Sequence, residues 1–164
     1  MLACLDVDYR PDVTVAACVL FREWTHGTEA AHIVDRGPPA APYEPGYFYR
    51  RELPHLLRVL AAVQEPLEAI VVDGYVWLGD DKPGLGAHLY EALNRAVPVI
   101  GVAKTAYQST GPAVLVLRGQ SLRPLFVTAV GIEPAVAADC VRRMHGPSRI
   151  PTLLNRVDRL SREP

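Results

Sequence analysis

The chain of 164 residues lacks several features that would place it in special classes of protein. It has three cysteines, Cys4, Cys18 and Cys140, an odd number without the spacing of a metal site. We therefore expect reduced core residues in a cytoplasmic protein, not a disulfide framework. No apolar run approaches the roughly 20 residues that span a bilayer, and Asp6 and Asp8 interrupt the apolar start too early for a signal peptide. We expect no association with membranes.

An excess of positive charge is also missing, since the formal net charge is -1. A protein that binds nucleic acid over its whole surface is disfavoured, but a local basic face remains compatible with this balance. Hydrophobic residues make up 49% of the chain, which excludes a disordered protein. The length and composition predict one domain over residues 1–164, and we expect a monomer.

The pattern of apolar runs and turns predicts a mixed α/β fold. Three strands, 2–7, 13–22 and 29–34, are joined by short turns and are typical of an antiparallel meander. The proline-rich segment 37–45 is expected to be a surface loop. The later expected elements are a helix over 51–63, a strand over 69–73, a helix over 87–96, a strand over 97–102, a hairpin of 113–117 with 125–130, and helices over 135–144 and 152–162. This order predicts a sheet of five or more strands with helices on both faces.

One stretch organises the functional part of the sequence. The run 69–72 is rich in β-branched residues, reads as a strand buried on both faces, and ends at Asp73. In open α/β sheets ligands bind at the carboxyl ends of the strands. The glycine-rich turn around Gly84 and Leu85 then leads into a helix, where a ligand can approach the backbone closely.

Four acidic residues are candidates for one site: Asp6, Glu52, Asp73 and Asp158. Carboxylates that converge repel one another unless a cation neutralises them, and oxygen ligands without a Cys or His cluster favour Mg²⁺ or Mn²⁺. Such ions activate water and hold phosphates, which indicates phosphodiester hydrolysis. The apolar neighbours of Asp6 favour a functional role for it. By position alone, however, a stabilising acid at a helix start is the favoured interpretation of Glu52, and a surface charge is the default for Asp158.

Two further residues have alternative interpretations. Lys104 follows a predicted strand and either orients a phosphate or is an exposed loop lysine. Tyr43, between Pro42 and Pro45, is either a packed loop aromatic or a rigid wedge that stacks on a base. Arginines in the last third of the chain are compatible with contacts to a phosphate backbone, although a solvated helix face is the default.

Four segments taken together resemble the endonuclease V family: LDVDY at 5–9, PYEPGYFYRRELPHLL at 42–57, IVVDG at 70–74, and PGLGAHL with PVIGVAKT within 83–105. That family consists of ribonuclease H-like enzymes that nick nucleic acid near deaminated bases, chiefly inosine. The resemblance runs in order over nearly the whole chain. It implies a ribonuclease H-like mixed sheet and a metal-dependent endonuclease of DNA repair that acts on DNA or RNA.

The resemblance also assigns roles to residues. It implies a Mg²⁺ site of Asp6, Glu52 and Asp73, for which Mn²⁺ can substitute, with Asp158 near the metal and Lys104 as the active-site lysine. The segment that contains Pro42, Tyr43, Pro45 and Gly46 matches the wedge that holds the strands apart. Gly84 and Leu85 match the turn that lines the pocket for the flipped base, in agreement with the need to take a base out of the stack before it is read.

This chain departs from the family pattern in places that concern the substrate. Asp8 stands where the family has a serine, and after Asp73-Gly74 the family's His-Gly and His-Pro-Arg are replaced by residues 75–76 and 79–81. Acidic residues in this loop would repel a phosphate backbone. Two alternatives to inosine-directed cleavage therefore stay open: a nuclease with another nucleic-acid target, and a non-catalytic nucleic-acid-binding module.

Overall fold

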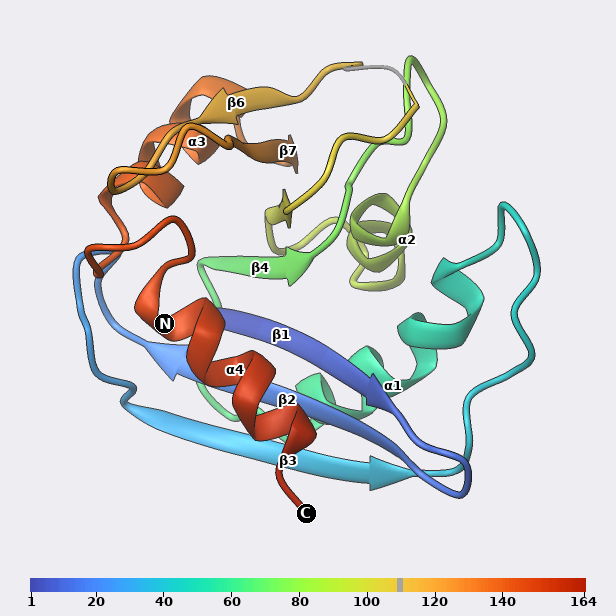
Figure 1. Ribbon diagram of the computed structural model, residues 1–164. Helices are drawn as coiled ribbons and strands as arrows, with labels where there is room; N and C mark the ends of the chain where they lie inside the picture. Colours follow the sequence, from blue (N-terminus) through green and yellow to red (C-terminus); the bar gives the residue numbers. More distant parts are fainter. Residues whose placement is uncertain (109–110) are drawn as a thin grey trace.

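The computed structural model describes residues 1–108 and 111–164, which form a mixed sheet of seven strands between two pairs of helices (Figure 1). The order of the strands is β3-β2-β1-β4-β5-β7-β6. The predicted α/β architecture, with an N-terminal meander and helices on both faces, is confirmed.

The first three strands form the predicted antiparallel meander. They are β1 (Leu2–Tyr9), β2 (Thr14–Phe21) and β3 (Ala31–Gly37). All residues of β2 are buried, because helices cover both faces of this strand. The third strand was predicted at 29–34, but β3 begins and ends later in the chain. Its pairing with β2 continues as far as Gly37, which lies opposite Thr14, so the strand extends to the start of the proline-rich loop.

The centre of the sheet determines where the functional side chains meet. Strand β4 (Ala69–Asp73) lies parallel to both β1 and β5 (Val99–Ala103). Leu5 is level with Val72, so Asp6 within β1 and Asp73 at the end of β4 lie side by side at the carboxyl edge of β4. Lys104 follows β5 directly at that edge. The hairpin of β6 (Val114–Val116) and β7 (Leu125–Val130) then adds to β5 in antiparallel order, as expected from the sequence.

The helices divide between the two faces of the sheet. Helices α1 (Tyr49–Ala61) and α2 (Leu85–Ala92) pack on the face that presents Leu5 and Val72. Helices α3 (Pro134–Arg143) and α4 (Thr152–Arg162) pack on the face that presents Cys4 and Val71. The range predicted for α2, 87–96, was too late: Gly84 precedes its first residue, and left-handed φ angles of 56° at Asn94 and 59° at Arg95 end helical geometry.

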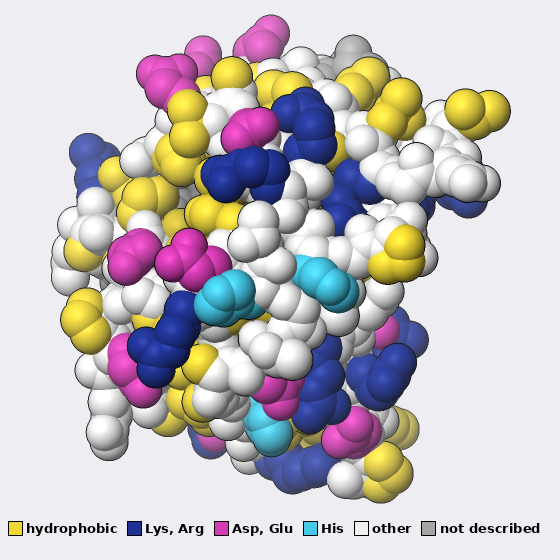
Figure 2. Space-filling model, turned by 90° about the vertical axis from the view of Figure 1, so that its left-hand side faces the viewer, with side chains coloured by type: hydrophobic (Ala, Val, Ile, Leu, Met, Phe, Trp, Pro, Cys, Tyr) yellow, Lys and Arg dark blue, Asp and Glu magenta, His cyan; other side chains and the backbone are white. Residues whose placement is uncertain are grey.

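Further expectations from composition can be compared with the structure. The three cysteines are buried and free, as predicted. Figure 2 shows a face on which acidic and basic side chains are interspersed, without a continuous basic field. Within the described ranges, no helix has both the length and the apolar character that crossing a bilayer requires.

Candidate active site

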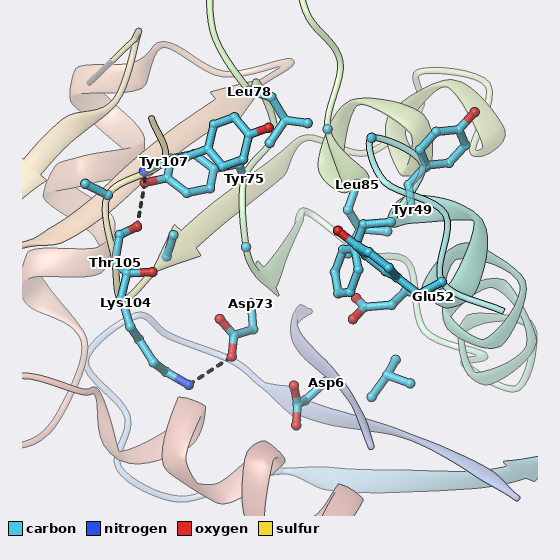
Figure 3. Close-up of a pocket in the computed structure, with 18 of the residues that line it drawn as sticks. Asp6, Tyr49, Glu52, Asp73, Tyr75, Leu78, Leu85, Lys104, Thr105 and Tyr107 are labelled. Carbon is cyan, nitrogen blue, oxygen red and sulfur yellow. Dashed lines mark hydrogen bonds and ion pairs between the residues drawn. The ribbon is translucent and has the colours of Figure 1, made fainter. Parts of the chain in front are cut away.

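A cavity of about 670 Å³ opens at the carboxyl edge of the parallel strands. Its walls combine charged and aromatic side chains, which come from the strand ends, the start of α1 and the loops after β4 and β5 (Figure 3). These side chains are Asp6, Glu52, Asp73, Lys104, Tyr43, Phe48, Tyr49, Tyr75 and Tyr107. The structure thus brings three of the four predicted acids and the predicted lysine to one cavity.

Lys104 and Asp73 form an ion pair at the floor of this cavity. The lysine Nζ donates to Asp73 Oδ2 at 2.9 Å, and both side chains are about two-fifths exposed, at 42% and 41%. Burial opposes the charge of Lys104, but the hydrogen bond to Asp73 and the nearby carboxylates outweigh it and raise its pKa. Lys104 is an exposed lysine in the loop after β5, but its ammonium group is paired with Asp73 and faces the acids.

Asp6 lies on the α4 side of the site. Its Oδ2 accepts a hydrogen bond from the hydroxyl of Ser161 at 2.7 Å. Burial raises the pKa of Asp6, and the negative charges of Asp73 and Asp158 raise it further, while the Ser161 hydrogen bond acts in the opposite direction. Asp6 therefore lies within the electrostatic field of two other carboxylates.

Glu52 approaches the site from α1. It lies in the first turn of the helix but faces inward, with 9% of its surface exposed. Burial raises the pKa of Glu52 to about 8, and the charges of Asp6 and Asp73 add to this effect. Glu52 thus lies in the first turn of α1, as a helix-start acid does, but its side chain is buried beside the cavity and within the field of the other carboxylates.

Asp158 borders the site from behind. Together with Asp6, Asp73 and Lys104 it lines a small void of about 20 Å³ beneath α4, large enough for about one water molecule. Its carboxylate also accepts from Arg162, with Oδ1 2.9 Å from the guanidinium nitrogen. Asp158 is therefore close to the other acids, as expected, but it does not line the main cavity.

The four acids offer carboxylate oxygens to a divalent cation. As the side chains stand, no three His, Cys, Asp or Glu among the described residues are arranged to hold one ion. The partners already described occupy Asp6, Asp73 and Asp158. Their chemistry nevertheless fits Mg²⁺ or Mn²⁺, because hard carboxylate oxygens face a common cavity and the charge of Asp73 contributes to the raised pKa of both Asp6 and Glu52.

The residues expected to contact substrate divide into two groups. Tyr43, which is 60% exposed, lines the cavity together with Gly46 and the helix-start residues Gly84 and Leu85. Pro42 and Pro45 are exposed on the same loop but do not contribute to the cavity wall. Gly84 has a steric reason to be glycine, since a Cβ there would lie 2.6 Å from the Tyr75 carbonyl oxygen.

Sequence reasoning missed the residues that hold the loop after β5. The Tyr75 hydroxyl donates to the Thr105 carbonyl oxygen at 2.7 Å and accepts from the Tyr107 backbone N–H at 3.2 Å. Arg149, from the α3–α4 connection, donates to the Lys104 carbonyl oxygen on the other side of this loop. Tyr75 follows Asp73-Gly74 and could have been noted for its position, whereas nothing in the sequence marks Arg149 among its neighbouring arginines.

The parallel strands of the sheet bring two aspartates and a lysine to an acidic cavity with aromatic walls. This arrangement defines a ribonuclease H-like α/β protein with a candidate active site. The family model for endonuclease V matches residues 1–112, and the chain belongs to that family.

Some relatives match nearly the whole sequence. Endonuclease V from Azotobacter vinelandii is 31% identical, over 98% of this chain and 81% of its own length. The crystal structure of endonuclease V from Streptomyces avermitilis is similar with a TM-score of 0.81 and 30% identity, over 98% of this chain and 79% of that one. Endonuclease V from Ciona intestinalis shares the fold, with a TM-score of 0.83 and 18% identity over 98% and 84% of the two chains. The chain spans only 44% to 64% of three other endonuclease V relatives.

Proposed function

We propose that this protein is a metal-dependent endonuclease that hydrolyses a phosphodiester bond near a deaminated base, inosine, in DNA or RNA. The observation that carries this proposal is the convergence of Asp6, Glu52, Asp73 and Lys104 on one cavity, in a chain of the endonuclease V family. The Ciona intestinalis relative was crystallised with DNA that contains an inosine followed by a ribo-adenosine, which supports a nucleic-acid substrate of this kind.

The shape and composition of the cavity support the entry of a base as well as a phosphate. Aromatic rings and Leu85 form the walls, with Glu52 beside Leu85, while Asp6, Asp73 and Lys104 lie at the floor (Figure 3). Aromatic side chains stack on nucleobases, and a base that leaves the helix needs such a receptor. Gly84 also lines this space, and it packs so closely against the Tyr75 carbonyl oxygen that a side chain could not fit there.

Asp6, Glu52 and Asp73 are the residues that would hold Mg²⁺, with Asp158 close by. When bound, the ion supplies charge neutralisation and lowers the pKa of a water molecule. Lys104 would donate to a non-bridging phosphate oxygen from its present place beside Asp73. The oxygen of water forms a bond to phosphorus, the bond from phosphorus to the 3′-oxygen breaks, and a proton passes to that oxygen. The products carry a 5′-phosphate and a 3′-hydroxyl.

A nicking assay tests this function. Matched DNA and RNA strands, each with and without a single inosine, are incubated with the wild type in Mg²⁺ and then in Mn²⁺. We expect cleavage near the inosine, and no cleavage by Asp73→Ala. Cleavage that is independent of inosine would indicate a nuclease with another target. An Asp73→Ala variant that nicks at the wild-type rate would overturn the role of the carboxylates.

A non-catalytic nucleic-acid-binding module is the second candidate. One observation favours it: Asp73 and Asp158 already have cationic partners, Lys104 and Arg162. Thermal unfolding with and without Mn²⁺ separates the two candidates, because a ligand that binds only the native state stabilises it. A nuclease with a functional metal site gains stability from Mn²⁺, and this gain disappears in Asp73→Ala. A binding module gains none.

A further inference from the structure

We infer that Ser161 is a positioning residue for Asp6, and that Arg10 holds Ser161 in place through the end of α4. This inference rests on the proposed function, since it concerns the carboxylate that would hold the metal. It assigns a role to a polar network on the α4 face of the site that the reaction described above does not use.

The side chains of Ser161 and Asp6 are in direct contact. Ser161 is fully buried, with 0% of its surface exposed, and its Oγ lies 2.7 Å from Asp6 Oδ2. The same Oγ lies 2.8 Å from the Asp158 carbonyl oxygen, one turn earlier in the helix. A hydroxyl has one proton, and an ionised carboxylate is a stronger acceptor than a carbonyl. The proton therefore belongs on Asp6 whenever that side chain is charged, which fixes one of its two oxygens.

The end of α4 is attached to the turn after β1. Arg10, in the turn after β1, donates from Nη2 to the Ser161 carbonyl oxygen at 3.1 Å and to the Glu163 carbonyl oxygen at 2.8 Å. The last carbonyls of a helix have no partner within the helix, so an arginine there supplies the missing donors. Because the bond reaches the backbone of Ser161 itself, Arg10 sets where the serine hydroxyl lies relative to β1.

Asp8 lies on the same face of β1 as Asp6. Its Oδ2 accepts from Arg10 Nε at 3.0 Å, so Asp8 holds the guanidinium that holds α4. Both side chains are partly buried, with 26% of Arg10 and 30% of Asp8 exposed. Asp8, at which this chain departs from the family pattern, thus has a structural role. The strand that carries Asp6 also carries the acid that orients Arg10.

Positioning of this kind has a measurable consequence. Partners that orient metal ligands typically change metal affinity or activity by about 10- to 100-fold when they are removed. Loss of the Ser161 hydroxyl leaves Asp6 free to turn, without removing any ligand. Alanine is the residue that favours a helix most, so Ser161→Ala is expected to fold.

The test measures Mn²⁺ binding to the whole chain by isothermal titration calorimetry, with kcat and the Mg²⁺ dependence of nicking as a second readout. We expect Ser161→Ala to weaken Mn²⁺ binding by about 10-fold or more, with a partial recovery of kcat at saturating Mg²⁺. Ser161→Thr, which keeps the hydroxyl, should bind more tightly than Ser161→Ala. Ser148→Ala, at an exposed position, is the matched control and should equal the wild type.

Arg10→Lys tests the attachment, because lysine keeps the charge but cannot form the same fork of hydrogen bonds. We expect it to weaken Mn²⁺ binding less than Ser161→Ala does, and the double variant to add little to Ser161→Ala alone. Equal affinity of Ser161→Ala and the wild type would overturn the inference while leaving the proposed function intact. A wild type that binds no Mn²⁺ would overturn the metal-dependent function itself, and this inference with it.

Discussion

The Nζ atom of Lys104 lies 2.9 Å from Oδ2 of Asp73, so a cation of the protein itself neutralises one of the three carboxylates at the cavity. The two residues come from neighbouring parallel strands and are separated by 31 positions in the chain. A divalent ion at this site must share Asp73 with the lysine or displace it. The role of Lys104 can therefore be separated from that of the metal ligands by experiment.

Replacing Lys104 by alanine should separate chemistry from metal binding. Because the competing ammonium is removed, we expect Mn²⁺ affinity at least equal to that of the wild type, measured by calorimetry. The rate of nicking should fall by about 100-fold or more. This is the lower end of the rate contribution of a group that moves a proton or stabilises charge in the transition state. An exposed ion pair contributes less than about 1 kcal/mol, so the melting temperature should change little. A variant that loses Mn²⁺ binding would contradict this division of roles.

Tyr75 should act on the substrate side of the site. Its hydroxyl bonds the loop after β5 at Thr105 and Tyr107, and the Tyr75→Phe variant loses both bonds. At about 1 kcal/mol for each of the two hydrogen bonds, we expect a melting temperature lower by about 4–8 °C. We also expect a KM for the oligonucleotide that rises severalfold, with unchanged Mn²⁺ affinity. Tyr90→Phe, outside the cavity, is the matched control, and an unchanged KM in Tyr75→Phe would refute the assignment.

Arg118 should be important for stability and not for metal binding. It is 6% exposed and donates to the carbonyl oxygens of Met144, Gly146, Ser148 and Arg149, which fold the α3–α4 connection. Arg118→Met would leave these acceptors without their donor, and we expect a loss of about 3 kcal/mol in the free energy of unfolding. Urea denaturation measures it, with the exposed Arg123→Met as control. A loss below about 1 kcal/mol would show that water replaces the guanidinium readily.

The contact between Glu29 and Arg156 should make stability depend on acid pH. Arg156 donates to both oxygens of Glu29, at 2.8 and 3.2 Å, and these hydrogen bonds lower the pKa of Glu29 from its ordinary value of 4.5. The folded protein therefore binds this proton more weakly than the unfolded chain does. The stabilisation is complete above pH 4.5 and is lost as the pH falls through the lowered pKa.

Melting temperatures measured from pH 7 to pH 3 test this dependence. Glu29→Gln should be less stable than the wild type at pH 7, and the difference should shrink as the pH falls. Glu23→Gln, at an exposed position, should follow the wild type throughout. A difference between Glu29→Gln and the wild type that stays constant with pH would show that Glu29 acts through packing and not through its charge.

Local patterns in the sequence determined much of the architecture. The helix over 152–162 was predicted with the bounds that the structure shows, because its apolar residues recur at helical spacing toward one face of the sheet. The strand that ends at Asp73 was also predicted correctly, since an unbroken β-branched run has no other stable place than the sheet centre. Acids at the carboxyl ends of neighbouring parallel strands lie at the same edge of the sheet, and for this reason the candidate site could be predicted from the sequence.

The tertiary structure alone decided how the site is held together. Ser161 and Asp6 are 155 positions apart, and Arg10 reaches the end of α4 over a similar distance in the chain. No periodicity encodes such pairs, because they depend on how α4 lies across β1. The same holds for the burial of Glu52: its position alone favoured a helix-start acid, and the packing of α1 turns it inward. Sequence patterns determine which face of an element is buried, whereas the partner of each polar side chain depends on the whole fold.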